Sequence, residues 1–406
     1  MSNEISRELF KAVLNQLKSC IISQMELPLK KNKIVLTGKG ILEALEISRR
    51  MKKTIFIAFD IEGKYRKVIL NKRFTIYLLP FRPNLDIIST NVCSFLLNNI
   101  KGYIKNIGIL IKILSYEKPD VTKVENVLLV GFPVYIASKI SRKPYFLWVA
   151  GPELKIIKMK LGVFPPIRKL LSIIYKLMAF LVIRDAKIVV NISPESEKLF
   201  LSLKPKKYIS LRSNYVNTGM FYPDVCKMTK DKKVVLYVGR LEKEKGIKLM
   251  LDAIEYLSEY KKRRDFELWI IGYGSLQKYI EARSKRLSIK IKIFGKKDIR
   301  ELPKYYNCAD IVLIPSLVRG PSASLLEAMS CGTAIISTTG PIKHLQNGII
   351  VNKNSYEIAE WIEKLLDNKK LRKKLCRAAR KFVENMSNHY LRTIFKVYSI
   401  TAERIK

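Results

Sequence analysis

A series of short apolar runs between residues 234 and 340 most constrains how this chain can fold. Each run is closed by a glycine or a polar residue and is followed by a helical pattern. A continuous apolar run is typical of a parallel strand that is buried on both faces, and strands that alternate with helices form βαβ units. The second half of the chain is therefore predicted to be a Rossmann-like α/β domain. Its predicted strands are residues 234–238, 267–271, 291–295, 310–314 and 333–337.

Charged residues follow the ends of these predicted strands. Gly239 and Arg240 close the first strand, Lys245 follows in the next turn, and Glu327 lies in the helix after residues 310–314. In an open α/β sheet, ligands bind in the crevice beyond the carboxyl ends of the strands. Two cations and a helix N-terminus at that edge predict a site for a diphosphate. A carboxylate there can accept hydrogen bonds from sugar hydroxyls.

The ordered series resembles the nucleotide-binding domain of family 4 glycosyltransferases over residues 214–352. The resemblance implies a GT-B architecture, in which two Rossmann-like domains face each other and the donor binds in the cleft. It implies an acceptor-side domain at residues 1–210, a nucleotide-sugar domain at residues 211–389, and a final helix at 390–406 that crosses back. The residues that carry the resemblance are Gly239, Arg240, Lys245, Gly246, Gly272, Gly274, Ala309, Asp310, Pro315, Ser316, Gly320, Glu327, Ala328, Met329 and Gly332.

The resemblance also assigns roles to residues. Arg240, Lys245 and Glu327 are the predicted catalytic residues. The acceptor side is predicted to include Gly38, Gly40, Gly151 and Glu153. The predicted donor-binding residues are Gly239, Gly272, Gly274, Pro315, Ser316, Arg319, Gly320, Pro321, Ser322, Ala323, Ser324 and Leu325.

The chemistry of such a site follows from its charges. Transfer from a nucleotide sugar requires that the diphosphate leaving group be stabilised as its bond to the sugar breaks. Arg240 and Lys245 supply fixed positive charge, and the helix that begins near Pro321 adds free N–H groups and its dipole. Neither a metal nor a cofactor is predicted. The alternative is that both cations are ordinary surface charges of a very basic protein.

Two positions depart from the family pattern. Arg319 stands where relatives carry a glutamate that contacts the donor sugar. A permanently charged side chain that only donates hydrogen bonds therefore replaces one that accepts them. This change fits an unusual donor, a shifted catalytic geometry, or a chain that binds without turnover. Glu153, after Gly151, stands near the place of a histidine in relatives, and the histidines of this chain are His344 and His389. Glu153 fits a polar substitute or a carboxylate facing water.

Two rival motifs lie in the first half. Asp60 and Glu62 follow a predicted strand and resemble the metal-binding acidic pair of the other large glycosyltransferase architecture. The pair stands alone, which disfavours that interpretation. The Gly38 and Gly40 segment lacks the length and order of a P-loop and fits a strand-to-helix turn instead.

The first half of the chain has a less regular α/β pattern. Residues 1–30 are predicted to form an amphipathic helix without the features of a signal peptide, and residues 41–51 to form a second helix. The domain boundary is expected between residues 210 and 217. The predicted strands of this half are residues 33–36, 54–59, 74–79, 127–130, 145–149 and 186–190.

Charge and hydropathy suggest a partner. The net charge is +41, from 76 basic and 35 acidic residues. A charge of this size favours anionic partners such as phospholipid or nucleic acid. The alternative is that it reflects a lysine-rich composition. Residues 167–183 are too short to span a bilayer and resemble a helix that lies in a membrane interface, or else a buried helix of the first domain. The apolar face of that helix comprises Leu170, Ile173, Ile174, Leu177, Met178 and Leu181.

The cysteines show no spacing typical of a disulfide pair or a metal site. We therefore expect reduced, mostly buried thiols in an intracellular protein. They are Cys20, Cys93, Cys226, Cys308, Cys331 and Cys376.

The sequence thus predicts a cytoplasmic hexosyltransferase, peripherally bound to the inner face of the cell membrane, that retains configuration and uses a UDP- or GDP-sugar. Its acceptor is predicted to be a lipid-linked glycan or a polysaccharide precursor. One alternative is an inactive GT-B protein that binds a sugar nucleotide or a membrane. Another is a DNA-directed glycosyltransferase, although the chain lacks a basic stripe interleaved with aromatic residues.

Overall fold

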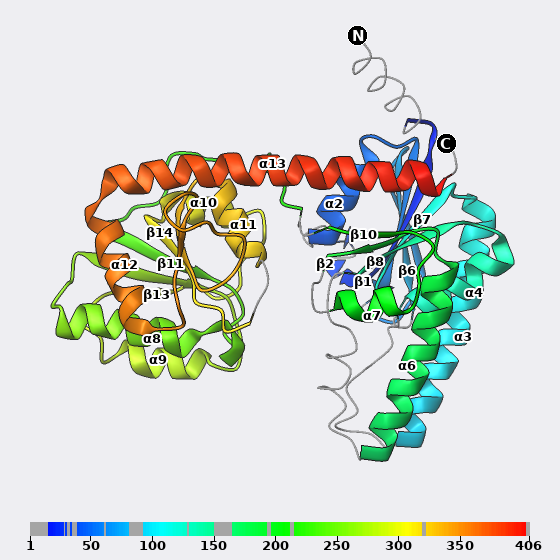
Figure 1. Ribbon diagram of the computed structural model, residues 1–406, viewed down its shortest axis with the longest axis horizontal. Helices are drawn as coiled ribbons and strands as arrows, with labels where there is room; N and C mark the ends of the chain where they lie inside the picture. Colours follow the sequence, from blue (N-terminus) through cyan, green and yellow to red (C-terminus); the bar gives the residue numbers. More distant parts are fainter. Residues whose placement is uncertain are drawn as a thin grey trace, which may run out of the picture. The chain divides into compact units, whose positions relative to one another are not determined.

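The computed structural model divides the chain into two compact units (Figure 1). Unit 1 comprises Met1–Ser213 and Leu391–Lys406, and unit 2 comprises Asn214–Tyr390. The structure describes residues 15–27, 29–30, 33–34, 39–60, 62–80, 92–127, 130–149, 165–192, 196–211, 215–318 and 322–402.

Unit 2 contains a parallel sheet with the strand order β13-β12-β11-β14-β15-β16. All neighbouring strands pair in parallel. Alternate side chains of β11 point into two separate cores: Val235 and Tyr237 pack in one, Val234 and Leu236 in the other, as the period of two in a strand requires. The strands are β11 (Lys233–Val238), β12 (Phe266–Ile271), β13 (Ile291–Ile293), β14 (Ile311–Ile314), β15 (Ala334–Ser337) and β16 (Ile349–Ile350).

Helices cover both faces of this sheet. Residues of α8, α9 and α12 belong to the first core, and residues of α10, α11 and α13 to the second. The strand order reverses at β11, so the edge beyond β11 and β14 is a topological switch point of the kind where ligands bind. The helical elements are η2 (Lys243–Lys245), α8 (Ile247–Glu255), η3 (Tyr256–Tyr260), α9 (Gln277–Ser284), α10 (Leu302–Cys308), α11 (Ala323–Ser330), α12 (Ser355–Asp367) and α13 (Lys369–Thr401).

Unit 1 contains a second sheet, with the order β10-β9-β8-β7-β1-β4-β6-β5. Its pairings are parallel except that of β5 with β6. The strands are β1 (Lys18–Leu27), β4 (Lys53–Asp60), β5 (Arg66–Asn71), β6 (Phe74–Leu79), β7 (Val121–Glu125), β8 (Tyr145–Val149), β9 (Val189–Asn191) and β10 (Tyr208–Ser210).

The helix expected over residues 1–30 is wrong for residues 18–27, because Lys18–Leu27 forms β1 in the middle of this sheet, whereas residues 15–16 are helical. Strand β1 pairs with β4 on one side and β7 on the other. Those two partner strands supply the hydrogen bonds that the backbone of β1 needs, and sequence periodicity alone does not reveal them. Of the strand expected at 33–36, the structure describes Lys33–Ile34, which form β3 and pair antiparallel with β2 (Leu29–Lys30) in a separate ribbon.

Other strand predictions for unit 1 had mixed outcomes. The strands expected at 54–59, 74–79 and 145–149 are confirmed as β4, β6 and β8. The strand expected at 127–130 is wrong at residues 127 and 130, the two that the structure describes: the chain pairs earlier, as β7, whose polar Lys123 is buried between Glu43 and Glu125. An apolar count misses such a strand because a buried ion pair replaces apolar contacts.

The helices of unit 1 pack on a shared core. Leu110 and Leu114 of α3, Val134 of α4, and Tyr175 and Val182 of α6 belong to it. None of the described helices has both the length and the apolarity needed to cross a membrane. The helices are α2 (Lys39–Ser48), α3 (Val92–Glu117), α4 (Gly131–Ser141), α6 (Pro165–Asp185), α7 (Glu197–Ser202) and the last part of α13.

Helix α6 has one buried and one exposed face, which bear on the two alternatives predicted for residues 167–183; contact with a membrane stays a prediction. Its inner face is buried in the core, through residues such as Tyr175 and Val182. Its outer face exposes apolar side chains: Ile173 and Leu177 are 56% and 60% exposed. The side chain of Leu170 lies outside the described part. The helix is therefore both a core element and an apolar surface.

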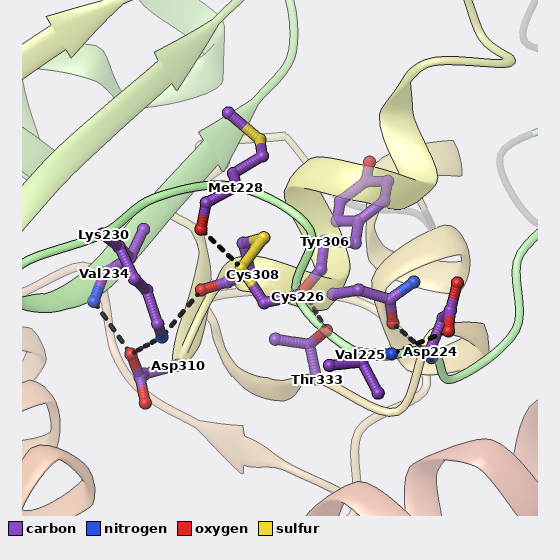
Figure 2. The surroundings of a disulfide bond; sticks show 11 residues. Asp224, Val225, Cys226, Met228, Lys230, Val234, Tyr306, Cys308, Asp310 and Thr333 are labelled. Carbon is purple, nitrogen blue, oxygen red and sulfur yellow. Dashed lines mark hydrogen bonds and ion pairs between the residues drawn. A yellow bond between two sulfur atoms is a disulfide. The ribbon is translucent and has the colours of Figure 1, made fainter.

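Figure 2 shows a disulfide between Cys226 and Cys308, which corrects the expectation of six reduced cysteines. Cys226 lies in the segment that leads to β11, and Cys308 ends α10 just before β14. Strands β11 and β14 are parallel neighbours, so the segments entering them run close together. Cys20 and Cys331 are free and buried, Cys376 is free and half-buried, and the side chain of Cys93 lies outside the described residues.

Candidate functional site

The loops after β11 and β14 meet at the switch point of unit 2. Gly246 has a φ of +72°, and a Cβ atom there would lie 1.8 Å from the carbonyl oxygen of Pro315. The N–H of Leu317 donates to the carbonyl of Glu244 over 2.9 Å. A glycine at position 246 therefore lets the turn that contains Lys245 pack directly on the segment that leads to α11.

The loop after β12 supports the same turn from its other side. The N–H of Leu241 donates to the carbonyl of Tyr273 over 2.8 Å. A Cβ atom on Gly272 would lie 1.8 Å from the carbonyl oxygen of Gly239. A Cβ atom on Gly274 would also collide, at 2.6 Å from the carbonyl oxygen of Leu241. The predicted donor-binding residues Gly239, Gly272 and Gly274 thus act here as close-packing positions of the backbone.

The two predicted catalytic cations differ in their surroundings. Arg240 is exposed, and its guanidinium forms an ion pair with Glu244 at 2.7 Å. Lys245 is half-buried and forms no ion pair with a residue that the structure describes. Burial, aided by the charge of Arg240, lowers the pKa of the Lys245 ammonium, and Glu244 opposes this shift. A cation whose pKa is lowered in this way is a frequent feature of functional sites.

Helix α11 follows β14, the strand next to β11 in the sheet. Ser322 is its N-cap, and the Ser322 hydroxyl accepts a hydrogen bond from the N–H of Leu325 over 3.1 Å. The hydroxyls of Ser322 and Ser324 lie 3.1 Å apart. The first N–H groups of a helix have no partner within the helix, so Ala323 and Ser324 present theirs at the end that attracts anions.

Other predicted donor residues lie in the segment before α11. The Ser316 hydroxyl donates to the carbonyl of Val318 over 3.2 Å, which gives Ser316 a role in shaping the loop. Arg319, Gly320 and Pro321 lie outside the described residues.

Glu327 is buried at 7% exposure on α11. Its Oε2 atom accepts a hydrogen bond from the Tyr306 hydroxyl over 2.9 Å. Burial, and then the nearby Glu327 carboxylate, raises the pKa of Tyr306 well above its usual value, so this phenol stays protonated as a donor. Sequence reasoning missed Tyr306, because it lies on α10, 21 residues from Glu327, and no local spacing indicates the contact.

The predicted acceptor-side residues belong to unit 1. Gly38, Gly151 and Glu153 lie outside the described residues, and Gly40 lies in the first turn of α2, the first helix after β3 among the described residues. In the rival acidic motif, Asp60 accepts from Arg66 Nε over 2.6 Å, and Glu62 also pairs with Arg66. Among the described residues there is no group of three or more His, Cys, Asp or Glu side chains placed to hold a metal ion.

Comparison with known proteins places these features in a family context. Residues 223–382 match the family described as "Glycosyl transferases group 1". An uncharacterized glycosyltransferase of Methanocaldococcus jannaschii is 33% identical over 183 residues, which are 43% of this chain and 46% of that protein. A second relative, from Campylobacter jejuni, is an α-1,4-N-acetyl-D-galactosaminyltransferase whose name includes an undecaprenol-diphosphate-linked glycan. It is 26% identical over 154 residues, which are 36% of this chain and 42% of that protein. This chain thus spans about half the length of the curated relatives it matches.

Solved structures resemble the whole chain. Sucrose-phosphate synthase of Thermosynechococcus elongatus matches with a TM-score of 0.67 and 14% identity. The match covers 95% of this chain and 100% of that chain. HepE of Anabaena, in a complex with UDP-glucose, matches with a TM-score of 0.63 and 14% identity, over 93% and 99%. The predicted fold class is confirmed: the chain has the α/β GT-B fold, with two units built on largely parallel sheets. The narrower assignment to family 4 stays a prediction.

Proposed function

We propose that this chain is a glycosyltransferase that moves a hexose from a UDP- or GDP-sugar to an acceptor, with retention of configuration and without a metal ion. One observation carries the proposal. The half-buried Lys245, the N-terminus of α11 and the buried Glu327 are all held beside the switch point of a Rossmann-like sheet. The match to the group 1 glycosyltransferases covers all of these residues.

In this proposal, the donor diphosphate lies between the Lys245 turn and the N-terminus of α11. The Lys245 ammonium and the free N–H groups of α11 stabilise the negative charge that grows on the leaving diphosphate. Arg240 exchanges its ion pair with Glu244 for the phosphate, because a guanidinium is well suited to bidentate phosphate recognition. Glu327, held by Tyr306, accepts hydrogen bonds from hydroxyls of the donor nucleotide.

We propose a lipid-linked glycan as the acceptor and peripheral contact with the inner face of the cell membrane. The exposed apolar face of α6 supports this proposal, together with the exposed Lys169 and Lys176 on the same helix. Such a combination is typical of helices that lie in a membrane interface. The name of the Campylobacter jejuni relative includes an undecaprenol-linked acceptor, which points to the same substrate class.

A donor screen tests the transfer reaction. Purified protein is incubated with UDP-, GDP- and ADP-sugars and a membrane lipid extract, with and without EDTA, and release of the nucleoside diphosphate is measured. We expect release from one donor that survives EDTA. Lys245→Ala and Glu327→Ala should each lower that rate by about 100-fold or more, in line with the loss of one group that stabilises a transition state. Lys248→Ala, an exposed lysine on α8, is the matched control and should keep the rate.

Full activity in Lys245→Ala or Glu327→Ala would refute the site. A protein that binds a nucleotide sugar, as measured by calorimetry, but releases nothing from any donor would favour the inactive binding protein. Arg319 is the sequence feature that motivates this second candidate. In that case Arg319→Glu should restore release.

A further inference from the structure

The first half of α13 carries a dense cluster of cations. Between Lys369 and Lys381 stand eight Lys and Arg residues and no Asp or Glu. Six of them make no hydrogen bond or ion pair with a residue that the structure describes. These six, which we call the α13 cationic face, are Lys369, Lys370, Lys373, Lys374, Arg377 and Lys381.

The other two cations hold the helix in place. Arg380 Nη1 donates to the backbone oxygens of Phe221 and Ser330, over 2.7 and 2.6 Å. Arg372 Nη1 donates to the backbone oxygen of Leu366 over 2.8 Å. These two arginines and apolar side chains such as Ala379 and Val383 attach the helix to its unit. The α13 cationic face is therefore not needed for that purpose.

Two adjoining grooves, of about 830 and 770 Å³, run along this face. The two acidic side chains of the larger groove already have partners: Asp310 pairs with Lys230, and Glu384 pairs with Arg380. Among the described residues, no aromatic side chain lines either groove. The cations therefore stand beside surface that offers them neither an available opposite charge nor a stacking platform. The cations that both grooves share are Lys373, Arg377 and Lys381.

The larger groove lies at the edge of the sheet opposite to the candidate donor site. It is bordered by Ala309 and Asp310, just before β14, and by Thr333, just before β15. The donor site lies beyond the carboxyl ends of the same sheet. A ligand in this groove therefore does not touch the donor.

We propose that the α13 cationic face binds the phosphate groups of an anionic phospholipid surface. Lys369, Lys373, Arg377 and Lys381 are spaced by four residues, so they form one row about 18 Å long that winds by about 120° around the helix. A row of mostly lysine cations suits a planar array of headgroups, because a lysine side chain is flexible and its ammonium acts as a point charge that needs no fixed geometry. Clusters of four to eight cations on a helix are typical of contacts with anionic lipid.

Nucleic acid is the less suitable partner. Proteins that bind single strands stack bases on aromatic side chains, and neither groove has one among the described residues that line it. The inference goes beyond the proposed transfer reaction, since it requires no turnover and concerns a different edge of unit 2.

Vesicle sedimentation tests the inference on the full chain. The probes are vesicles of phosphatidylcholine with and without phosphatidylglycerol, each across a salt series. The variant Lys373→Gln, Arg377→Gln, Lys381→Gln removes the three cations shared by both grooves. Each cation near an anionic surface contributes about fivefold to partition, so the variant should bind phosphatidylglycerol vesicles roughly 100-fold more weakly. Donor turnover in solution should be unchanged.

A matched control removes the same charge elsewhere on unit 2. Lys278→Gln, Lys285→Gln, Arg286→Gln changes three exposed cations on and after α9, which Figure 1 shows on the side of the unit away from α13. This variant should lose little vesicle binding. A second variant, Lys373→Arg with Lys381→Arg, keeps the charge and should bind vesicles as the original chain does, which separates charge from folding.

Three results would overturn the inference. The first is an equal effect of the α13 and α9 variants on phosphatidylglycerol vesicles. The second is loss of duplex DNA binding in the α13 variant with no change in vesicle binding. The third is abolition of vesicle binding by millimolar inorganic phosphate at constant ionic strength, which would indicate a site for free phosphate. Each outcome is independent of whether the protein turns over a donor.

Discussion

At the scale of single residues, Lys245 is the side chain whose environment is best suited to chemistry. Burial lowers its pKa from the value of 10.5 for a free lysine, and it forms no ion pair with a residue that the structure describes. The unfolded chain binds this proton more tightly than the folded protein does, so the shift destabilises the fold at neutral pH. That penalty disappears as the pH rises through the folded pKa towards 10.5. A site that keeps such a cation is prepared to bind an anion.

We predict that the alkaline limb of the turnover profile reports Lys245. The rate should fall as the ammonium deprotonates, at a pH below that expected for an ordinary lysine. Arginine stays charged at any accessible pH, so Lys245→Arg, if active, should move this limb upwards. The measurement is kcat/KM for the donor against pH. An identical alkaline limb in the two proteins would assign the titration to another group.

Tyr306 is predicted to position Glu327. Tyr306→Phe removes the hydroxyl that donates to the carboxylate and keeps the ring against Phe221. A buried hydrogen bond to a charged group contributes about 1.5–3 kcal/mol, so the KM for the donor should rise roughly tenfold or more with a smaller change in kcat. Steady-state kinetics separate the two constants. Tyr305→Phe, which changes the neighbouring tyrosine, is the control and should leave the KM unchanged.

At the scale of elements, the candidate site depends on how closely two loops approach. The turn that contains Lys245 packs on Pro315 because residue 246 has no side chain. Gly295 has a similar backbone conformation, with a φ of +65°, but a Cβ atom there would meet nothing within 4 Å. Substitution of Gly295 therefore tests the backbone conformation alone, whereas substitution of Gly246 tests the conformation together with the close contact to Pro315.

We predict different outcomes for the two alanine variants. Gly295→Ala should destabilise the fold by about 1–2 kcal/mol, the penalty of a left-handed conformation with a side chain. Gly246→Ala should destabilise the fold further and lower donor turnover, since its Cβ atom would force the Pro315 segment to move. Urea unfolding monitored by circular dichroism, together with donor turnover, measures both effects. Equal stability and activity of the two variants would show that the close approach is unimportant.

The disulfide ties the entry of β11 to the end of α10. It closes a loop across a sequence separation of 82 residues, and disulfides of this kind typically stabilise a fold by about 2–4 kcal/mol. We predict that the variant Cys226→Ser, Cys308→Ser unfolds at a lower urea concentration than the oxidised protein. Thiol counting by mass spectrometry under denaturing, non-reducing conditions should find two fewer thiols than the six cysteines of the chain. Six free thiols would show that the bond does not form.

At the scale of the whole molecule, α13 belongs to both units. Its first part packs in the second core of unit 2 through Ala379 and Val383. Its last part belongs to unit 1, where Phe395 and Tyr398 are buried and the Tyr398 ring packs edge-on against Phe146. One helix therefore supplies core side chains to two units.

We predict that deleting residues 391–406 destabilises unit 1 far more than unit 2. The deletion exposes the apolar surface that Phe395 and Tyr398 cover, and each such side chain contributes about 1.5–3 kcal/mol when buried. Hydrogen exchange read by mass spectrometry should show faster exchange in β7 and β8, with little change in β11 and β12. Uniform acceleration in both units would indicate that they unfold as a single body.

The sequence by itself determined most of unit 2 and the order of its candidate site. Parallel strands buried on both faces appear as apolar runs, and glycines mark the turns that follow them, so β11, β12 and β14 could be located from local pattern alone. For the same reason Arg240, Lys245 and Glu327 could be placed after strand ends from the order of residues along the chain.

Only the tertiary structure decided features that depend on contacts between distant residues. Strand β1 is a strand because β4 and β7 pair with it, Cys226 meets Cys308 because β11 and β14 are neighbours, and Tyr306 supports Glu327 across two helices. The collision that a side chain on Gly246 would cause with Pro315 belongs to the same class. Each of these contacts joins segments whose spacing in the sequence carries no periodic signal, and only folding brings them together.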